Sequence, residues 1–111
     1  MNIQIFGVKK CFDTKKAQRW FKERNIKFQF IDLTQKEMSL GEFESVCKAV
    51  GGMEALLNPK AKNAASLQYL ALEEDRIAKL LAEPDLMRTP VVRNGRQATV
   101  GYMPAVWSDW E

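Results

Sequence analysis

The first 33 residues constrain the fold of this chain more than any other segment. Residues 3–8, Ile-Gln-Ile-Phe-Gly-Val, are mostly apolar and β-prone, which predicts a short buried strand. Residues 26–33 alternate between two faces, as a half-buried second strand would. A helical pattern lies between them. Strand, helix and strand in so short a segment predict a βαβ unit, whose parallel strands are joined by a right-handed crossover.

The helix between these strands has recognisable ends. Gly7 permits a tight exit from the first strand. Asp13 or Thr14 can cap the start of the helix, and Asn25 ends it. The apolar residues at helical spacing are Ala17, Trp20 and Phe21.

The middle of the chain, about residues 39–82, predicts a helical insertion between strands. Ser39 can cap its first helix, and Glu42 completes a capping box. The helical segments expected within the insertion are residues 39–50, 53–57 and 73–82.

The C-terminal residues return to β structure. Two β-prone runs, residues 91–93 and 97–100, flank Asn94-Gly95, which predicts a two-residue hairpin. The expected final helix opens at Pro104 and carries Trp107 and Trp110. The order β-α-β, helical insertion, β-β-α therefore predicts an α/β domain, with a mixed sheet covered by helices.

The chain has no histidine and two cysteines. It therefore lacks the base of Ser-His-Asp and Cys-His catalysis, and a structural zinc site would need four cysteines, so no metal site is expected. Cys11 and Cys47 do not resemble the disulfide framework of a secreted domain. Neither a signal peptide nor a run of about 18 apolar residues is present in the sequence. We expect a cytoplasmic protein that does not associate with membranes.

Positive charge is concentrated at one end of the chain. Residues 1–31 carry eight cations and two acidic residues, a net charge of +6, so the remainder of the +3 chain carries −3. A solvated helix face explains most of these cations. Nucleic-acid binding is not expected, because the sequence shows neither a known binding module nor aromatic residues interleaved for base stacking.

Cys11 is the candidate nucleophile, because it lies between the first strand and the first helix. Lowering a thiol pKa from about 8.5 to about 6.5 requires about 2.7 kcal/mol. A helix N-terminus supplies up to about 2 kcal/mol, and Lys9, Lys10 and Lys15 can add to it, whereas Asp13 opposes it. The alternative is that Cys11 is a small buried apolar residue.

The sequence contains no Cys-x-x-Cys motif, because Thr14 occupies the position of the second cysteine. Another molecule or a distant residue must therefore resolve any disulfide of Cys11. The Thr14 hydroxyl can instead donate to the thiolate, or cap the helix. Cys47 lies in an apolar helical stripe, so we expect an inert packed thiol, with a resolving role as the alternative.

The N-terminal segment resembles the ArsC, Spx and YffB group of thioredoxin-fold proteins. The matching positions are Cys11, Lys16-Ala17, Trp20, Asp32, residues 54–58, residues 88–92 and Val100-Gly101. The resemblance covers nearly the whole chain and is specific at the family level. It implies that residues 1–111 form a single thioredoxin-like domain, with a mixed sheet, a helical insertion and a cis proline at Pro90 beside the cysteine loop.

Three departures separate the chain from arsenate reductases of this group. Those enzymes resemble one another in three arginines around the cysteine, and here the corresponding residues are Asn58, Thr89 and Tyr102. Arg88 lies one residue before the second of these positions, Thr89. Lys60 is the cation nearest in sequence to the first position, Asn58. Guanidinium groups bind oxyanions bidentately and lysine does not, so arsenate reduction is disfavoured. The chain also lacks the Cys-x-x-Cys switch typical of Spx regulators, and it is most similar to the YffB-like branch.

The sequence and the resemblance together favour a cytoplasmic thiol oxidoreductase, with catalytic Cys11 and no bound cofactor. Glutathione is the expected co-substrate, with a redoxin as the other possible reductant. The residues expected around the thiolate or the substrate are Lys10, Thr14, Lys15, Arg88, Thr89 and Pro90. The main alternative is an Spx-like regulator that binds RNA polymerase or another protein without catalysis. A true arsenate reductase ranks third.

Overall fold

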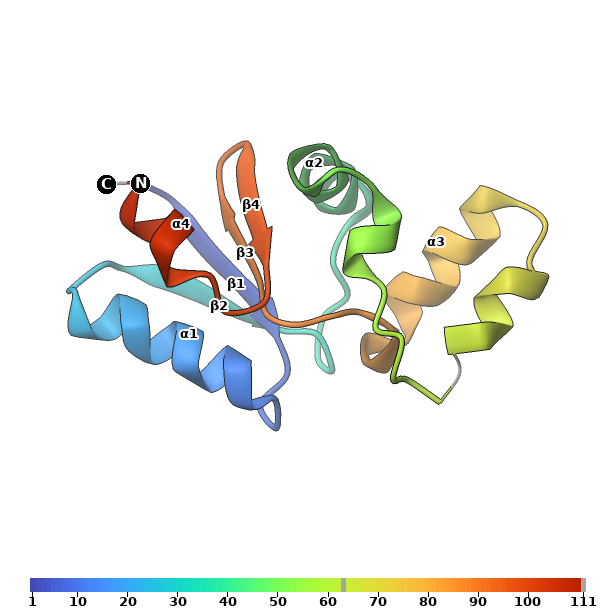
Figure 1. The fold of residues 1–111 in the computed structure, drawn as a ribbon, viewed down its shortest axis with the longest axis horizontal. Coiled ribbons are helices and arrows are strands. Elements are labelled where there is room, and N and C mark those ends of the chain that lie inside the picture. Colours follow the sequence, from blue (N-terminus) through green and yellow to red (C-terminus); the bar gives the residue numbers. More distant parts are fainter. Residues whose placement is uncertain (63, 111) are drawn as a thin grey trace.

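The computed structural model describes residues 1–62 and 64–110 of the 111-residue chain. In this part of the chain, four strands form one mixed sheet with helices on both faces (Figure 1). The strands are β1 (Ile3–Gly7), β2 (Phe28–Asp32), β3 (Val91–Asn94) and β4 (Gln97–Val100). The α-helices are α1 (Phe12–Glu23), α2 (Leu40–Val50), α3 (Glu73–Ala82) and α4 (Pro104–Ser108). The 3₁₀ helices are η1 (Met53–Leu56), η2 (Ala64–Tyr69) and η3 (Pro84–Leu86).

The strand order in the sheet is β2-β1-β3-β4. β1 runs parallel to β2, with Ile3 opposite Phe28, and antiparallel to β3, with Ile5 opposite Val92. β3 and β4 form the antiparallel hairpin. The parallel pair on either side of α1 confirms the βαβ unit expected from the first 33 residues.

Alternation along the strands gives each face of the sheet its own apolar cluster. Ile5 and Val92 pack with α1 and α4, whereas Phe6 and Val91 pack with the helical segments between β2 and β3. The first group, here called the aromatic cluster, consists of Ile3, Ile5, Ala17, Trp20, Phe21, Val92 and Trp107. The second group, here called the insertion cluster, includes Phe6, Phe43, Val46, Leu56, Leu80, Leu86 and Val91.

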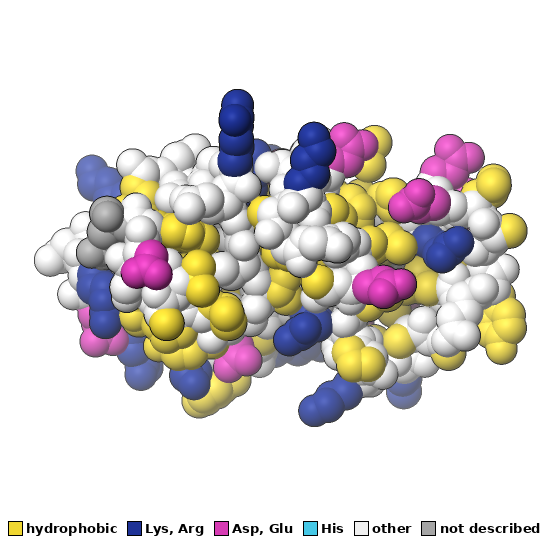
Figure 2. Space-filling model, turned by 45° about the horizontal axis from the view of Figure 1, so that its top comes forward, with side chains coloured by type: hydrophobic (Ala, Val, Ile, Leu, Met, Phe, Trp, Pro, Cys, Tyr) yellow, Lys and Arg dark blue, Asp and Glu magenta, His cyan; other side chains and the backbone are white. Residues whose placement is uncertain are grey.

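The helical insertion begins at α2, which packs against β4. The expected capping box is present: Ser39 Oγ accepts from the Glu42 N–H (3.1 Å), and Glu42 Oε1 accepts from the Ser39 N–H (2.9 Å). Gly51 ends the helix with a φ of 95°, a conformation that favours glycine. Apolar side chains remain visible among charged ones on the surface of this half of the molecule (Figure 2).

Backbone pairing connects η1 with the segment before β3. The Asn58 N–H donates to the Leu86 carbonyl (2.8 Å), and the Arg88 N–H donates to the Leu56 carbonyl (2.7 Å). Leu57 and Met87 form an antiparallel bridge between these two bonds. The insertion is thereby fixed beside the loop that leads into β3.

Two expected boundaries at the C-terminal end differ in the structure. Asn94 pairs with Gln97, so the hairpin loop is Gly95-Arg96 and not Asn94-Gly95. Gly95 has a φ of 60°, whereas Arg96 is not among the residues with a positive φ. A positive φ at the first loop residue alone is typical of a type II′ turn, which favours glycine at that position. Trp110 lies beyond the end of α4, where its N–H donates to the Trp107 carbonyl (3.1 Å).

Candidate functional site

Cys11 is the N-cap residue of α1. Its N–H donates to the Val8 carbonyl (3.1 Å), and its carbonyl accepts from the Lys15 N–H (3.2 Å). The expectation that Asp13 or Thr14 caps this helix is wrong, because both residues already lie inside α1. The Cys11 side chain therefore occupies the position of a capping group, next to the unpaired N–H groups of the first helical turn.

Thr14 is completely buried between α1 and β1. A Cβ atom on Gly7 would lie 2.5 Å from Thr14 Oγ1, so Gly7 is needed for this close approach of helix and strand. Among the residues that the structure describes, the buried Thr14 hydroxyl has no hydrogen-bond partner of good geometry. The Thr14 side chain is nevertheless one of the groups that lower the pKa of the Cys11 thiol.

The loop before β3 forms the second wall of the site. The Thr89-Pro90 peptide bond is cis, as the resemblance implied. Cys11 Sγ donates to the Thr89 carbonyl at 3.7 Å, although 78 residues separate the two in sequence. Pro90 is buried and its carbonyl accepts from the Gly101 N–H (2.8 Å), which holds this loop against the end of β4.

The pKa of the Cys11 thiol is lowered from its ordinary value of 9.0. Burial of the half-buried thiol acts to raise the pKa. Hydrogen bonds from the side chains of Thr14 and Thr89, together with the backbone N–H groups of Thr14 and Asp13, outweigh burial and favour the thiolate. Cys11 lies at the start of α1, as its position in the sequence predicts. The Asp13 carboxylate, expected to oppose the thiolate, is not among the causes that shift this pKa, and the Asp13 backbone N–H is one of the stabilising donors.

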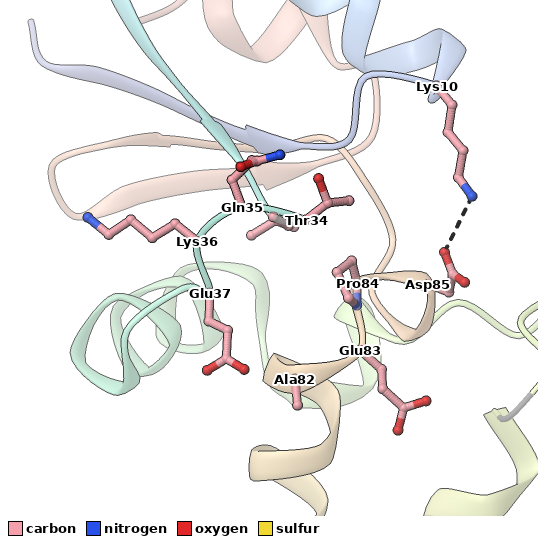
Figure 3. Close-up of a pocket in the computed structure, with 10 residues that line it drawn as sticks. Lys10, Thr34, Gln35, Lys36, Glu37, Ala82, Glu83, Pro84 and Asp85 are labelled. Carbon is pink, nitrogen blue, oxygen red and sulfur yellow. Dashed lines mark ion pairs between the residues drawn. The ribbon is translucent and has the colours of Figure 1, made fainter.

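The predicted contribution of the lysines to this pKa is corrected by the structure. Lys9 and Lys15 are exposed and are not among the causes that lower it. Lys10 extends away from the helix start toward η3, where its Nζ lies 3.8 Å from Asp85 Oδ1 (Figure 3). Both side chains of this pair are about four-fifths exposed, at 80% and 78%, so the ion pair is weak.

The Cys11 sulfur lies at a hollow of about 490 Å³ between β1, η1 and η3. Its lining residues are Val8, Lys10, Cys11, Asn58, Ala61, Lys62, Pro84, Asp85, Met87 and Thr89. Of the residues expected around the substrate, Lys10 and Thr89 line this hollow, whereas Lys15 and Arg88 do not. An adjoining hollow of about 520 Å³, drawn in Figure 3, shares Lys10, Pro84 and Asp85 with it.

Several lining residues were not singled out from the sequence. Met87 and Asp85 reach the hollow because the pairing of Leu57 with Met87 brings η1 and η3 together, a contact with no local sequence signal. Asn58 was noted only as the residue in place of an arginine, and it does line the hollow. The described lining of the Cys11 hollow contains no arginine.

Cys47 has the opposite electrostatic environment. Burial raises the pKa of the Cys47 thiol, and the carboxylates of Glu73 and Glu44 raise it further. Both cysteines are free thiols, and Cys47 packs against the insertion cluster. This placement agrees with an unreactive packed thiol.

Within residues 1–62 and 64–110, no group of three or more histidine, cysteine, aspartate or glutamate side chains could hold a metal ion. No helix in the same residues is long and apolar enough to cross a membrane.

The chain is similar in sequence and in fold to several known proteins. The ArsC family model matches residues 6–110. The global transcriptional regulator Spx 2 of Oceanobacillus iheyensis is 26% identical over 92% of this chain and 78% of its own length. Arsenate reductase from Vibrio cholerae superposes with a TM-score of 0.82 at 21% identity, over 98% of this chain and 97% of the other.

Another solved structure, the YffB protein, superposes with a TM-score of 0.80 at 24% identity, over 96% of each chain. A weaker likeness, with a TM-score of 0.51 at 15% identity, extends over all of this chain and 96% of the glutaredoxin-like NrdH-redoxin from Escherichia coli. At these identities the superpositions are evidence of fold alone. They confirm the expected thioredoxin-like fold.

Proposed function

The chain belongs to the ArsC family, and from this membership and the Cys11 site we propose that it is a thiol oxidoreductase with one nucleophilic cysteine. The observation that carries the proposal is the set of hydrogen-bond donors that favours the thiolate of Cys11 at the edge of an open hollow. A thiolate is the attacking species in thiol-disulfide exchange, so a lowered pKa increases the reactive fraction at neutral pH. No histidine is required for this activation.

The proposed reaction has two exchange steps. The Cys11 thiolate attacks one sulfur of an oxidised substrate, such as a glutathione mixed disulfide, and forms a new S–S bond as the substrate S–S bond breaks. The leaving thiolate takes a proton from solvent. A second thiolate, from glutathione or a redoxin, then attacks the mixed disulfide and releases Cys11. An external reductant is part of the proposal because Thr14 occupies the position of an adjacent resolving cysteine.

The hollow supplies groups suited to a small peptide thiol. The lining has two cations, Lys10 and Lys62, against one carboxylate, Asp85, and this excess of positive charge would attract the carboxylates of glutathione. Ionisation of Cys11 removes the donor to the Thr89 carbonyl, so that carbonyl becomes free to accept from a substrate N–H. Lys15 and Arg88, which lie outside the lining, contribute only to the general positive field. The cytoplasm, with its pool of reduced glutathione, is the compartment that this chemistry requires.

Arsenate reduction is a less suitable function for this site. A multiply charged oxyanion needs several guanidinium donors, and the described lining of the Cys11 hollow has none. We therefore expect no measurable arsenate-dependent oxidation of glutathione. A clear arsenate-dependent rate, lost in Cys11→Ser, would overturn this expectation.

A regulatory function is the second candidate, and the similarity to an Spx regulator favours it. In that case the chain would bind RNA polymerase or another protein, and Cys11 chemistry would be dispensable. Capture of RNA polymerase subunits from a bacterial extract, unchanged by Cys11→Ser, would support this function over the enzyme.

Mass spectrometry after incubation with oxidised glutathione is the primary test of the enzyme. We expect a single glutathione adduct on Cys11 in the wild type and in Cys47→Ser, and none in Cys11→Ser. The adduct should disappear on addition of reduced glutathione, with turnover of a small disulfide in the same mixture. An adduct confined to Cys47, or no adduct at all, contradicts the proposal.

A further inference from the structure

A second hollow, of about 510 Å³, lies between α2 and α3 and shares no lining residue with the Cys11 hollow. Its lining residues are Glu37, Leu40, Glu44, Glu73, Glu74, Ile77, Ala78 and Leu81. We refer to it as the acidic groove. Figure 2 shows acidic side chains around exposed apolar ones on this helical half of the molecule.

The floor of the acidic groove is apolar. Leu40, the first residue of α2, is 53% exposed, and Ile77 and Leu81 lie four residues apart on α3, both half-buried. Leu72, directly before α3, is 54% exposed. Leu40, Ile77 and Leu81 line the same hollow rather than lying as scattered single residues, and such a grouping marks a contact site more often than a solvated surface.

The rim of the groove is acidic on both sides. Its lining includes four glutamates and no lysine or arginine. α3 carries two cations, and neither lines the groove: Lys79 is paired with Glu83 (2.8 Å), and Arg76 lines a different hollow. None of the four rim carboxylates has an ion-pair partner among residues 1–62 and 64–110.

The Cys47 thiol shows independently that carboxylates from both sides of the groove lie near the same point. Glu44 on α2 and Glu73 on α3 both raise its pKa, after burial, which is the largest cause. Acidic residues in the first turn of α3 would by themselves be ordinary helix stabilisation. That explanation does not extend to Glu37, which precedes α2, or to Glu44, which lies in the second turn of α2.

We propose that the acidic groove binds a lysine- or arginine-rich amphipathic helix of a partner protein. The apolar face of such a helix would cover Leu40, Ile77 and Leu81, and its cations would pair with the glutamates on each side. Charge complementarity selects this occupant over an uncharged or acidic helix. The site is separate from Cys11, so it does not depend on the proposed oxidoreductase function.

The probe for this inference is a fluorescein-labelled peptide of lysine and leucine, about 18 residues or about five helical turns long, that forms an amphipathic helix. Its fluorescence anisotropy is titrated with the full chain at low and at physiological salt. We expect saturable one-to-one binding. A peptide of the same composition, with its leucines dispersed around the helix, should bind at least about tenfold more weakly, because it cannot cover the apolar floor.

Matched variants locate the binding site. The double variant Glu44→Gln/Glu73→Gln should weaken binding about fivefold to tenfold, and Leu40→Ser should also weaken it. The control double variant Glu23→Gln/Glu54→Gln removes the same charge outside the groove and should change the affinity less than about twofold. Cys11→Ser should bind as the wild type does. Circular dichroism and a cooperative urea unfolding transition show that Glu44→Gln/Glu73→Gln is folded.

Three results would overturn the inference. The first is no saturable binding of the amphipathic peptide, and the second is equal weakening by the groove and control double variants. The third is self-association of the chain that is abolished by Glu44→Gln/Glu73→Gln. It would assign the groove to a second copy, whose basic helix α1 carries an exposed Phe12 (74%).

Discussion

At the residue scale, Thr14 connects reactivity with stability. Among the described residues its buried hydroxyl has no hydrogen-bond partner of good geometry, which costs about 1–3 kcal/mol, and its side chain also lowers the pKa of the Cys11 thiol. We expect Thr14→Val to raise the pKa of Cys11, because one donor to the thiolate is lost. At a pH below the pKa of Cys11, the same variant should increase the free energy of unfolding by about 1 kcal/mol, because it removes an unpaired buried hydroxyl.

Thr99→Val is the matched control for this prediction. Thr99 is also buried, but its Oγ1 accepts from Trp107 Nε1–H (2.8 Å). Loss of that acceptor should destabilise the protein by about 1–3 kcal/mol and leave the pKa of Cys11 unchanged. Thiolate absorbance against pH and urea unfolding measure the two effects. An unaltered Cys11 pKa in Thr14→Val would show that the hydroxyl does not act on the thiolate.

The two cysteines should titrate on opposite sides of the ordinary thiol pKa of 9.0. Iodoacetamide alkylation against pH is expected to show one midpoint below 9.0, retained in Cys47→Ser, and one above it, retained in Cys11→Ser. Because the pKa of Cys11 is lowered on folding, its thiolate stabilises the folded state above the unfolded pKa, and this contribution is lost as pH falls through the folded pKa. A reversed order of the two midpoints would refute the assignment of the nucleophile.

The sequence could predict which cysteine has the lowered pKa, but not all of the groups that lower it. The position of Cys11 after a strand and before a helix is a local pattern, and it survives in the structure. The contact with the Thr89 carbonyl depends on a loop 78 residues away. The pKa of Cys11 also depends on the orientation of the Thr14 side chain. The sequence left open whether this side chain caps the helix or donates to the thiolate, because the answer depends on how α1 packs on β1.

At the element scale, the packing of α1 on β1 depends on the absence of a side chain at Gly7. A Cβ atom there would lie 2.5 Å from Oγ1 and 2.6 Å from Cγ2 of Thr14. We expect Gly7→Ala to reduce the free energy of unfolding by about 1–3 kcal/mol, because the helix must move away from the strand. The displacement should also slow alkylation of Cys11, which is fixed to the start of that helix.

Two further variants test this steric cause. Gly7→Ala/Thr14→Ala removes the two closest atoms, Oγ1 and Cγ2, and leaves only the Cβ of residue 14 at 3.1 Å, so it should recover most of the stability without recovering the lowered Cys11 pKa. Gly41→Ala, in α2, meets no atom within 4 Å and should stabilise the protein by about 0.5–1 kcal/mol through helix propensity. Equal stability of Gly7→Ala and the wild type would rule out the close contact.

Local patterns predicted the elements well where their ends are set by nearby residues. The capping box of Ser39 and Glu42 predicted the start of α2 correctly, and the helix ends at Val50 as expected. The hairpin loop was displaced by one residue because strand register, with Asn94 opposite Gln97, decides which residues form the turn. η2 (Ala64–Tyr69) was not predicted, since its sequence lacks a clear apolar period.

At the scale of the whole molecule, the sheet joins two apolar clusters that face opposite ways. Consecutive residues of β1 and β3 belong to different clusters: Ile5 and Val92 to the aromatic cluster, Phe6 and Val91 to the insertion cluster. Neither cluster can lose its strand residues without disturbing the other. The two halves should therefore unfold together, although the insertion contributes no strand of its own.

The tryptophans provide a direct test of this coupling, because all three contact the aromatic cluster and none contacts the insertion cluster. Leu80, 1% exposed on α3, belongs to the insertion cluster. Leu80→Ala should reduce stability by about 2–5 kcal/mol, and the unfolding midpoints from tryptophan fluorescence and circular dichroism should fall by the same amount. Leu72→Ala, at a 54% exposed position, should change either midpoint little. Loss of helical signal before the tryptophan transition would instead show that the insertion unfolds independently of the sheet.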